Sequence, residues 1–474
     1  MKQIRLTAYI TAFIMVMATL TAYASDPQMF VYRNDSVFNS THLRSGVNVT
    51  HSTSGSPTIH IQDENGEMID IPMSSIDSCV LRVADIPTLH ISLPDYPDVK
   101  DIWSKEDYVD AVLSIEGNGY CEDIDSLRLS LRGRGNTTWN MYKKPMRMKF
   151  PKKISLFGMA KQKNYVLLAN YIDDSLMKNA IAFWIARRLG VPYANHTTPV
   201  NVIINGHPRG SYLITEKVGI NSGSVDIDET KGILFELSGE YDEKYKFRSE
   251  PYNLPVMVKD PDFDELYEDN PDGPTPDGML EMWKEDFNRV LRLLEAGRSQ
   301  NTFDWDSFAR GLLLNNICLN GELGHPKSLY IHKEQIGTDA LYKFGPVWDF
   351  DAAFNMRKPN KEGEFVEMPF SAVLVLHPML QDITNRQEFK DIYKEALQKF
   401  ASEDMADLIA FIKEYAALIE PSSKMDTMIW PESYSLDWFD RKPAYNVRES
   451  ADRLCQWLTE RVEFLLDRSE HGWF

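Results

Sequence analysis

The chain has 474 residues, with 51 Lys and Arg against 70 Asp and Glu, so its formal net charge is −19. Hydrophobic residues make up 43% and charged residues 26%, which excludes a disordered chain, a collagen-like repeat and a multi-span membrane protein. The acidic balance also argues against nucleic acid as a partner, because that binding needs basic patches that neutralise phosphates. The length predicts about two or three domains, or one two-lobed body with a small appendage.

Residues 1–24 have the pattern of a secretory signal peptide. Lys2 and Arg5 precede an apolar run over residues 6–20, and residues 22–24 (Ala-Tyr-Ala) have the small-x-small pattern of a cleavage site. The alternative is an uncleaved membrane anchor. No other stretch is apolar enough to span a bilayer, so we expect an exported mature chain without a membrane span, in the periplasm, at the cell surface or secreted.

The cysteine and histidine residues carry no recognisable metal or redox motif. The four cysteines are widely spaced and include no CxxC pair, so a zinc site or a disulfide scaffold is not predicted. No HExxH or HxH pattern occurs, which argues against a metalloprotease. The disulfide state and the oligomeric state stay open.

The first half of the chain is rich in strand patterns. Residues 25–86 alternate apolar and polar positions over short runs, which predicts a small β-rich module. In residues 87–258 we expect strands and one long helix over residues 174–189. Asn205-Gly206 lies between two strand-like runs and predicts a β-hairpin.

The second half is mostly helical. Residues 259–279 are acidic and proline-rich, which predicts a solvated loop, and residues 280–474 are expected to form a helix-rich body. The expected helices are 279–297, 305–320, 385–419 and 447–468, and the strand-like runs among them are 328–332 and 341–348. The fold class is therefore α+β, in a two-lobed order that resembles a protein-kinase layout after a small β-rich N-terminal module.

The first candidate site is a basic glycine turn. Residues 131–139 (LRGRGNTTW) end one strand, and residues 143–150 (KKPMRMKF) begin another, within a stretch that is strongly basic although the chain is acidic. Glycines allow the backbone to turn sharply near a phosphate, and Arg and Lys supply charged donors. The alternative is an ordinary hairpin with solvated basic residues.

Two further clusters are acidic or polar. Asp349 and Asp351 follow a strand-like run, and in extended backbone both carboxylates would emerge on one side, where Mg²⁺ could bind them together with phosphate oxygens. Residues 320–328 contain Asn320, Glu322 and Lys327 between a buried-looking helix and a strand, where a kinase-type site needs a base and an amide. The alternatives are turn-forming carboxylates and ordinary loop residues.

Together with residues 164–170 (NYVLLAN), 176–179 (LMKN) and 205–218, these three clusters resemble the CotH kinase family. The resemblance covers about residues 86–400 in five ordered motifs. It implies a kinase-like fold that uses ATP and Mg²⁺ or Mn²⁺ and transfers phosphate to Ser or Thr hydroxyls of a protein substrate.

The resemblance also assigns roles to individual residues. It implies that Asp349 binds the metal with help from Asp351, and that Glu322, Asn320 and Asp349 form the catalytic group. The residues that it implies near the nucleotide are Arg132, Arg134, Asn136, Lys144, Arg147, Lys149 and Glu216. Two positions depart from the family's common pattern: Glu322 stands where Asp is common, and Lys178 stands where Arg is frequent.

Two other functions remain open. One is a catalytically inactive, kinase-like envelope or surface binding protein, in which the 25–86 module docks a partner or aromatic residues stack on sugars. The aromatic residues considered for that role are Trp430, Tyr434, Trp438 and Phe439. The other is a hydrolase that uses two carboxylates such as Glu322 and Asp349.

Overall fold

The computed structural model describes residues 27–33, 36–42, 48–52, 58–62, 68–72, 74, 78–83, 86–298, 302–324, 326–354, 377–434 and 446–470. The predicted signal peptide over residues 1–24 lies outside these ranges, as do Trp438 and Phe439. Among the described helices, none combines the length and the apolar composition that a bilayer crossing requires.

The N-terminal segment is β-rich, as the sequence predicts. It forms two antiparallel three-stranded sheets, with the strand orders β2-β1-β6 and β3-β4-β5. The strands are β1 (Pro27–Arg33), β2 (Ser36–His42), β3 (Asn48–Ser52), β4 (Thr58–Gln62), β5 (Met68–Pro72) and β6 (Ser78–Val83). In β4 the buried Ile59 and Ile61 alternate with half-buried polar residues, which is the period of two that the sequence shows.

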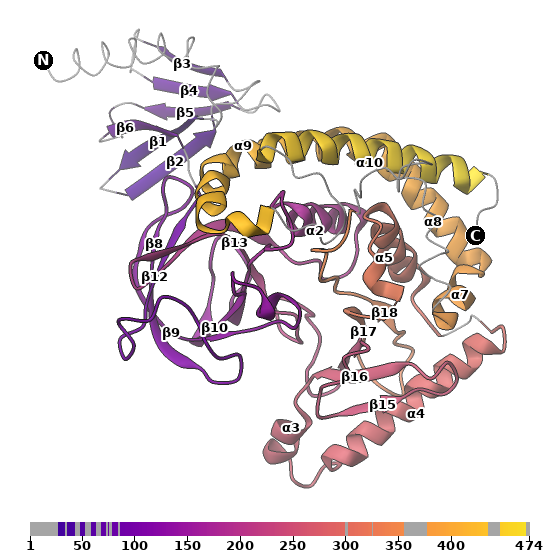
Figure 1. Cartoon of the computed structure of the whole chain (residues 1–474). Helices are drawn as coiled ribbons and strands as arrows, with labels where there is room; N and C mark the ends of the chain where they lie inside the picture. Colours follow the sequence, from indigo (N-terminus) through magenta and orange to yellow (C-terminus); the bar gives the residue numbers. More distant parts are fainter. Residues whose placement is uncertain are drawn as a thin grey trace, which may run out of the picture.

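The next seven strands form a closed barrel, which the sequence analysis does not predict (Figure 1). They are β7 (Thr88–Ser92), β8 (Val109–Glu116), β9 (Ile124–Gly133), β10 (Met146–Ile154), β11 (Gln162–Leu168), β12 (Thr197–Ile204) and β13 (His207–Glu216). The order around the barrel is β10-β11-β13-β12-β7-β8-β9, and pairing of β9 with β10 closes it. Inward-facing apolar side chains such as Leu131, Met146 and Ile214 fill its interior as one core.

The hairpin between β12 and β13 confirms the Asn-Gly prediction. Asn205 and Gly206 have φ angles of 47° and 80°, so both central residues adopt the left-handed conformation that a two-residue type I′ turn requires. The expected long helix, α2 (Lys178–Leu189), begins four residues later than predicted. The Asp173 carboxylate accepts hydrogen bonds from Ser175 and Lys178 backbone N–H groups, and this turn precedes the helix.

A second sheet joins the two halves of the chain. Its five antiparallel strands run in the order β15-β16-β14-β17-β18. They are β14 (Ile233–Leu237), β15 (Lys246–Arg248), β16 (Pro255–Asp260), β17 (Leu329–Lys333) and β18 (Lys343–Phe344). Strand β14 thus lies inside the expected first lobe but pairs with β17 of the expected second lobe. Together with α2, they share one large core with the helices that follow.

The helical half agrees with the expected apolar periodicity. The helices are α3 (Phe263–Asp269), α4 (Pro276–Glu295), α5 (Trp305–Ile317), α7 (Pro378–Thr384), α8 (Gln387–Lys399), α9 (Met405–Ile429) and α10 (Val447–Glu470). Helices α9 and α10 pack on each other along one side of the molecule, and α9 reaches the barrel at β13 (Figure 1).

The acidic segment 259–279 is not the continuous loop that the sequence predicts. Strand β16 extends to Asp260, α3 follows, and α4 begins at Pro276. The Asp262 carboxylate caps α3 by accepting from the Asp264 and Glu265 backbone N–H groups, and Phe263 is fully buried. The Asp262 cap and the buried Phe263 therefore stabilise a short helix within this charged segment.

Candidate active site

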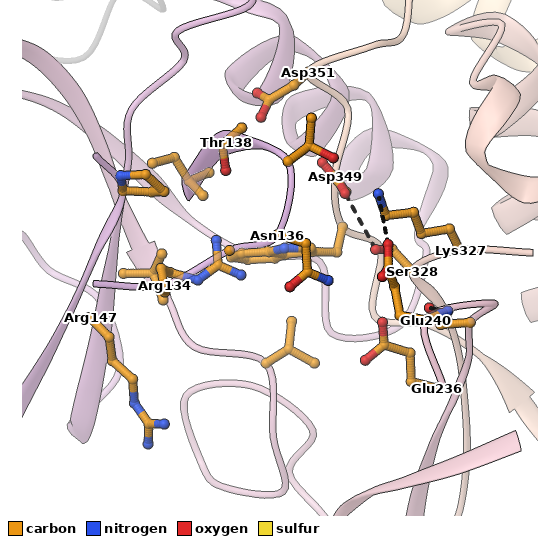
Figure 2. Close-up of a pocket in the computed structure, with 18 of the residues that line it drawn as sticks. Arg134, Asn136, Thr138, Arg147, Glu236, Glu240, Lys327, Ser328, Asp349 and Asp351 are labelled. Atoms are coloured by element: carbon orange, nitrogen blue, oxygen red, sulfur yellow. Dashed lines mark hydrogen bonds and ion pairs between the residues drawn. The ribbon is translucent and has the colours of Figure 1, made fainter. Parts of the chain in front are cut away.

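A cavity of about 750 Å³ is lined by the turn after β9, the end of β13, strands β14 and β16, and the loops on either side of β17 (Figure 2). This volume is in the range of small-molecule sites. Eight of the candidate residues named from the sequence line it: Arg132, Arg134, Asn136, Arg147, Glu322, Lys327, Asp349 and Asp351. Basic side chains from the barrel therefore face carboxylates from the second half of the chain across one cavity.

The glycine turn holds Arg134 in this cavity. A Cβ atom at Gly133 would lie 2.0 Å from the Trp139 ring, so only glycine allows the ring to pack there. Gly135 has a φ of +88°, in the left-handed region that favours glycine. The Arg134 backbone N–H donates to Pro145 O at 3.1 Å, which ties the turn to the start of β10.

Arg134 is the cation that faces the carboxylates. Its guanidinium lies over the Trp348 ring, 5.4 Å from the ring centroid. Burial lowers the pKa of Arg134, and the charge of Asp349 opposes that effect more than any other neighbour does. Because the pKa of arginine starts above 12, Arg134 stays charged and remains available to bind an anion.

Arg132 and Arg147 surround the Tyr108 ring. Their guanidinium carbons lie 4.9 Å and 5.9 Å from its centroid, and Lys149 Nζ also lies 5.9 Å from it. Arg132 donates to Lys105 O at 2.5 Å, and Arg147 donates to Asn164 Oδ1 at 2.9 Å. These contacts hold several positive charges close together on one side of the barrel.

Asp349 and Asp351 both line the cavity, although not in the extended backbone that the sequence analysis assumed. Asp349 has a φ of 66°, a left-handed conformation that Asp tolerates better than most residues. Its Oδ2 atom accepts a long hydrogen bond from Ser328 Oγ at 3.5 Å (Figure 2). Burial, and next the negative charge of Asp349, raise the pKa of Asp351 to about 7.

Helix α2 fixes the loop that carries these aspartates. The Asn179 amide nitrogen donates to Asp351 Oδ1, and Asn179 Oδ1 accepts from the Phe350 backbone N–H at 3.0 Å. Lys178 donates to the Asp351 carbonyl oxygen at 3.1 Å. Both side chains are buried at the start of α2, so they set the position of the carboxylates.

The donor chemistry of this pair fits a magnesium ion. Burial, and then the negative charge of Asp349, raise the pKa of Asp351, and a divalent cation would relieve the repulsion between the two carboxylates. In the described part of the chain, no group of three or more His, Cys, Asp or Glu side chains is arranged to hold a metal. Asp349 and Asp351 would therefore need oxygen ligands from water or a phosphate to complete the coordination.

Glu322 reaches the cavity, whereas Asn320 does not. Asn320 is buried; its Nδ2 atom donates to Asn315 Oδ1 at 3.1 Å, and its Oδ1 atom accepts from the Glu322 backbone N–H at 3.2 Å. Asn320 thus shapes the turn that presents Glu322. The Glu322 carboxylate lies 3.7 Å from Lys327 Nζ. Lys327 Nζ also lies 3.7 Å from Glu240 Oε1 (Figure 2).

Three other residues predicted near the nucleotide do not line the cavity. Lys144 donates to Trp139 O at 2.6 Å and so supports the turn, and Lys149 is exposed. The buried Glu216 carboxylate accepts from the His196 backbone N–H at 2.8 Å. Successive side chains of a strand point to opposite faces, so the neighbouring Lys217 lines the cavity in place of Glu216.

Several lining residues were not recognised in the sequence. Lys217 is one of them. Glu236 comes from β14, Glu240 from the loop between β14 and β15, and Lys259 from β16. Lys259 Nζ pairs with Glu236 Oε2 at 3.0 Å. Strand periodicity places Lys217 and Glu216 on opposite faces, but only the pairing of β14 with β17 identifies β14 and β16 as cavity walls.

The suggestion of exposed sugar-stacking aromatic residues is wrong for Trp430. Its side chain is buried, its indole N–H donates to Arg209 O at 2.9 Å, and the Arg209 guanidinium lies over its ring. The residue contributes to packing between α9 and the barrel.

Comparison with known proteins adds one match. A family model described as CotH kinase protein matches residues 131–465, which include the glycine turn at residues 131–139, residues 320–328, the Asp349–Asp351 pair and all of the described helices from α2 to α9. No curated protein matches the chain.

Proposed function

This chain belongs to the CotH kinase protein family, and we propose that it is an exported atypical protein kinase that transfers the γ-phosphate of ATP to Ser or Thr hydroxyls of envelope or extracellular proteins. One observation carries the proposal: within the matched segment, a single cavity holds Arg134 on one side and the Asp349–Asp351 pair on the other. The signal-like pattern of residues 1–24 supports export. A two-lobed, kinase-like arrangement around this cavity is part of the proposal.

In this mechanism, Asp349 and Asp351 hold the divalent cation, and Asn179 keeps Asp351 in position. When bound, the cation would supply charge neutralisation to the phosphate oxygens. Arg134 stabilises the charge that develops on the transferred group, because it is held rigidly over Trp348 in a partly water-excluded site.

Glu322 is the general base. It accepts the proton of the acceptor hydroxyl while that oxygen forms a bond to the γ-phosphorus atom, and ADP leaves with the electrons of the broken P–O bond. Lys327, 3.7 Å away, favours the ionised carboxylate that this role requires.

Nucleotide binding without catalysis is the second candidate. The same Lys327–Glu322 contact favours it, because a carboxylate held by a lysine is a weaker proton acceptor. In that case the protein would bind a partner at the envelope and use the cavity only as a ligand site.

The deciding experiment compares three proteins: the wild type, Asp349→Asn and Asp339→Asn, in which an exposed carboxylate outside the cavity is changed. Each is incubated with radiolabelled ATP, Mg²⁺ and a mixture of exported proteins. We expect label in the acceptors with the wild type and Asp339→Asn, and at least a hundredfold less with Asp349→Asn. Nucleotide binding without any label would favour the second candidate, and equal labelling by all three would refute the assigned role of Asp349.

A further inference from the structure

Lys217 directly follows β13, and the mechanism proposed above assigns no role to its positive charge. Its backbone N–H donates to Asn164 O at 3.3 Å, which continues the pairing of β13 with β11. Its side chain lines the cavity, whereas the preceding Glu216 is turned toward His196. The end of β13 therefore places the Lys217 side chain in the cavity.

The charges around Lys217 are unbalanced. Arg147 and Lys259 add positive charge, and Asp260 and Glu243 are the nearby carboxylates. Both carboxylates already serve other donors: Asp260 Oδ2 accepts from the Ile220 backbone N–H at 2.7 Å, and Glu243 Oε1 accepts from Lys259 Nζ at 2.7 Å. Within the described residues, Lys217 itself makes no ion pair.

Arg147 is a second cation in the cavity whose side-chain partner is neutral. Its guanidinium is bound by the neutral Asn164 amide oxygen, so its charge is not cancelled by a carboxylate in direct contact. In Figure 2 it extends away from Asp349 and Asp351, on the far side of Arg134. Burial, and next the charge of Arg147, lower the pKa of Lys217 to about 8, although the charge of Asp260 opposes this effect.

We propose that Lys217 and Arg147 together form an oxyanion subsite, which binds a phosphate group at the end of the cavity away from Asp349 and Asp351. Two adjacent cations with a planar arginine fork match phosphate oxygens, and an anion there would relieve their mutual repulsion. A Cβ atom at Gly219 would lie 2.7 Å from Asp260 Oδ2 and 3.5 Å from Lys217 Nζ, so glycine allows the close backbone approach beside Lys217. The nucleotide as the source of the phosphate rests on the proposed function, whereas the subsite itself does not.

Calorimetric titration tests the subsite directly, with ATP, adenosine and inorganic pyrophosphate as ligands. The proteins are the wild type, Lys217→Met, Lys217→Arg and the control Lys163→Met, which changes an exposed lysine on β11. We expect Lys217→Met to bind ATP and pyrophosphate about tenfold or more weakly and to leave adenosine binding unchanged. Lys217→Arg and Lys163→Met should bind like the wild type.

The pH dependence supplies an independent readout. Above about pH 8 the free Lys217 is increasingly neutral, so binding of a phosphate must take up a proton and affinity must fall as the pH rises. Wild type should show that proton uptake in buffers of different ionisation enthalpy, whereas Lys217→Met and Lys217→Arg should not. Arg147, Lys259, Asp260 and Glu243 remain in all of these proteins, so the difference reports Lys217 alone.

The outcomes separate the subsite from the proposed function. Weaker pyrophosphate binding by Lys217→Met, with ATP binding unchanged, supports the subsite but assigns it to a phosphate other than that of ATP. Equal ATP and pyrophosphate affinities in wild type and Lys217→Met refute the subsite and leave the kinase proposal intact. A wild type that binds neither ligand refutes both.

Discussion

Lys143 Nζ lies 2.6 Å from Asp426 Oδ1, and both side chains are almost completely buried between the barrel and α9. The same carboxylate oxygen accepts from the Ser211 backbone N–H at 2.8 Å, and Lys143 also donates to Ser211 O. This pair connects the turn between β9 and β10, strand β13 and a helix more than 200 residues further along the chain.

We expect Asp426→Asn to lower the free energy of unfolding by about 3–5 kcal/mol, because it leaves the Lys143 ammonium buried without its counter-ion. Urea denaturation measures the change. The control is Lys424→Met, which removes an exposed lysine paired with Glu420 on the same helix and should cost less than about 1 kcal/mol. Similar losses in the two variants would contradict the role given to the buried pair.

Asn179→Ala should raise the concentration of Mg²⁺ needed for half-maximal phosphate transfer by about 10- to 100-fold. The substitution removes the amide that donates to Asp351 and accepts from Phe350, so the Asp349–Asp351 loop loses its support. Activity measured over a range of Mg²⁺ concentrations tests this expectation. Asn385→Ala changes an exposed residue after α7 and should leave the Mg²⁺ dependence of activity unchanged.

Glu322→Gln should reduce kcat by about 10²- to 10⁴-fold and leave ATP affinity nearly unchanged, because the substitution removes the proton acceptor but keeps its shape. Steady-state kinetics and a separate nucleotide titration measure the two quantities. Glu240→Gln removes the other carboxylate near Lys327 and is the matched control, with kcat expected within a fewfold of the wild type. An unchanged kcat in Glu322→Gln would argue for a base elsewhere.

His332 makes stability depend on pH in the acidic range. Burial lowers its pKa to about 4, and its Nδ1 atom hydrogen-bonds to Gly345 O at 2.8 Å. Because the pKa is 6.5 in the unfolded chain, the unfolded state binds more protons between pH 6.5 and 4. Neutral His332 therefore contributes about 3 kcal/mol to the free energy of unfolding above pH 6.5, and this contribution is lost as the pH falls toward 4.

The test compares melting temperatures of the wild type and His332→Asn from pH 7 to pH 4. The asparagine amide can still donate to Gly345 O but does not titrate, so the variant should lose less stability over this range. Parallel curves for the two proteins would show that His332 is not responsible for the loss.

The local elements follow from the sequence because their causes are local. The Asn205-Gly206 turn is specified by two residues that tolerate positive φ, and α4, α5 and α10 follow the apolar periodicity of their own segments. The glycine turn at residues 133–135 and the Asp349–Asp351 pair were also identified as cavity residues, because charge next to glycine or after a buried strand is a short-range signal.

Other features depend on partners that are distant in the chain. Closure of the barrel requires β9 to pair with β10 and β12 to pair in parallel with β7, more than 100 residues earlier, and period-two patterns are the same in open and closed sheets. The side chain of Glu216 was placed at the nucleotide, but the cavity lies on the other face of β13, where Lys217 points.

The sequence by itself determined the long helices of the second half, the Asn205-Gly206 hairpin, the clusters that carry charge, and the family resemblance. Only the tertiary structure decided that Arg134, Lys217, Glu322 and Asp349 share one cavity, because β14 pairs with β16 on one side and with the distant β17 on the other. The physical reason is range: backbone propensity acts over a few residues, whereas burial and charge pairing depend on which distant surfaces exclude water together. The net charge of −19 illustrates this, since an acidic chain assembles a cationic cavity wall only when it folds.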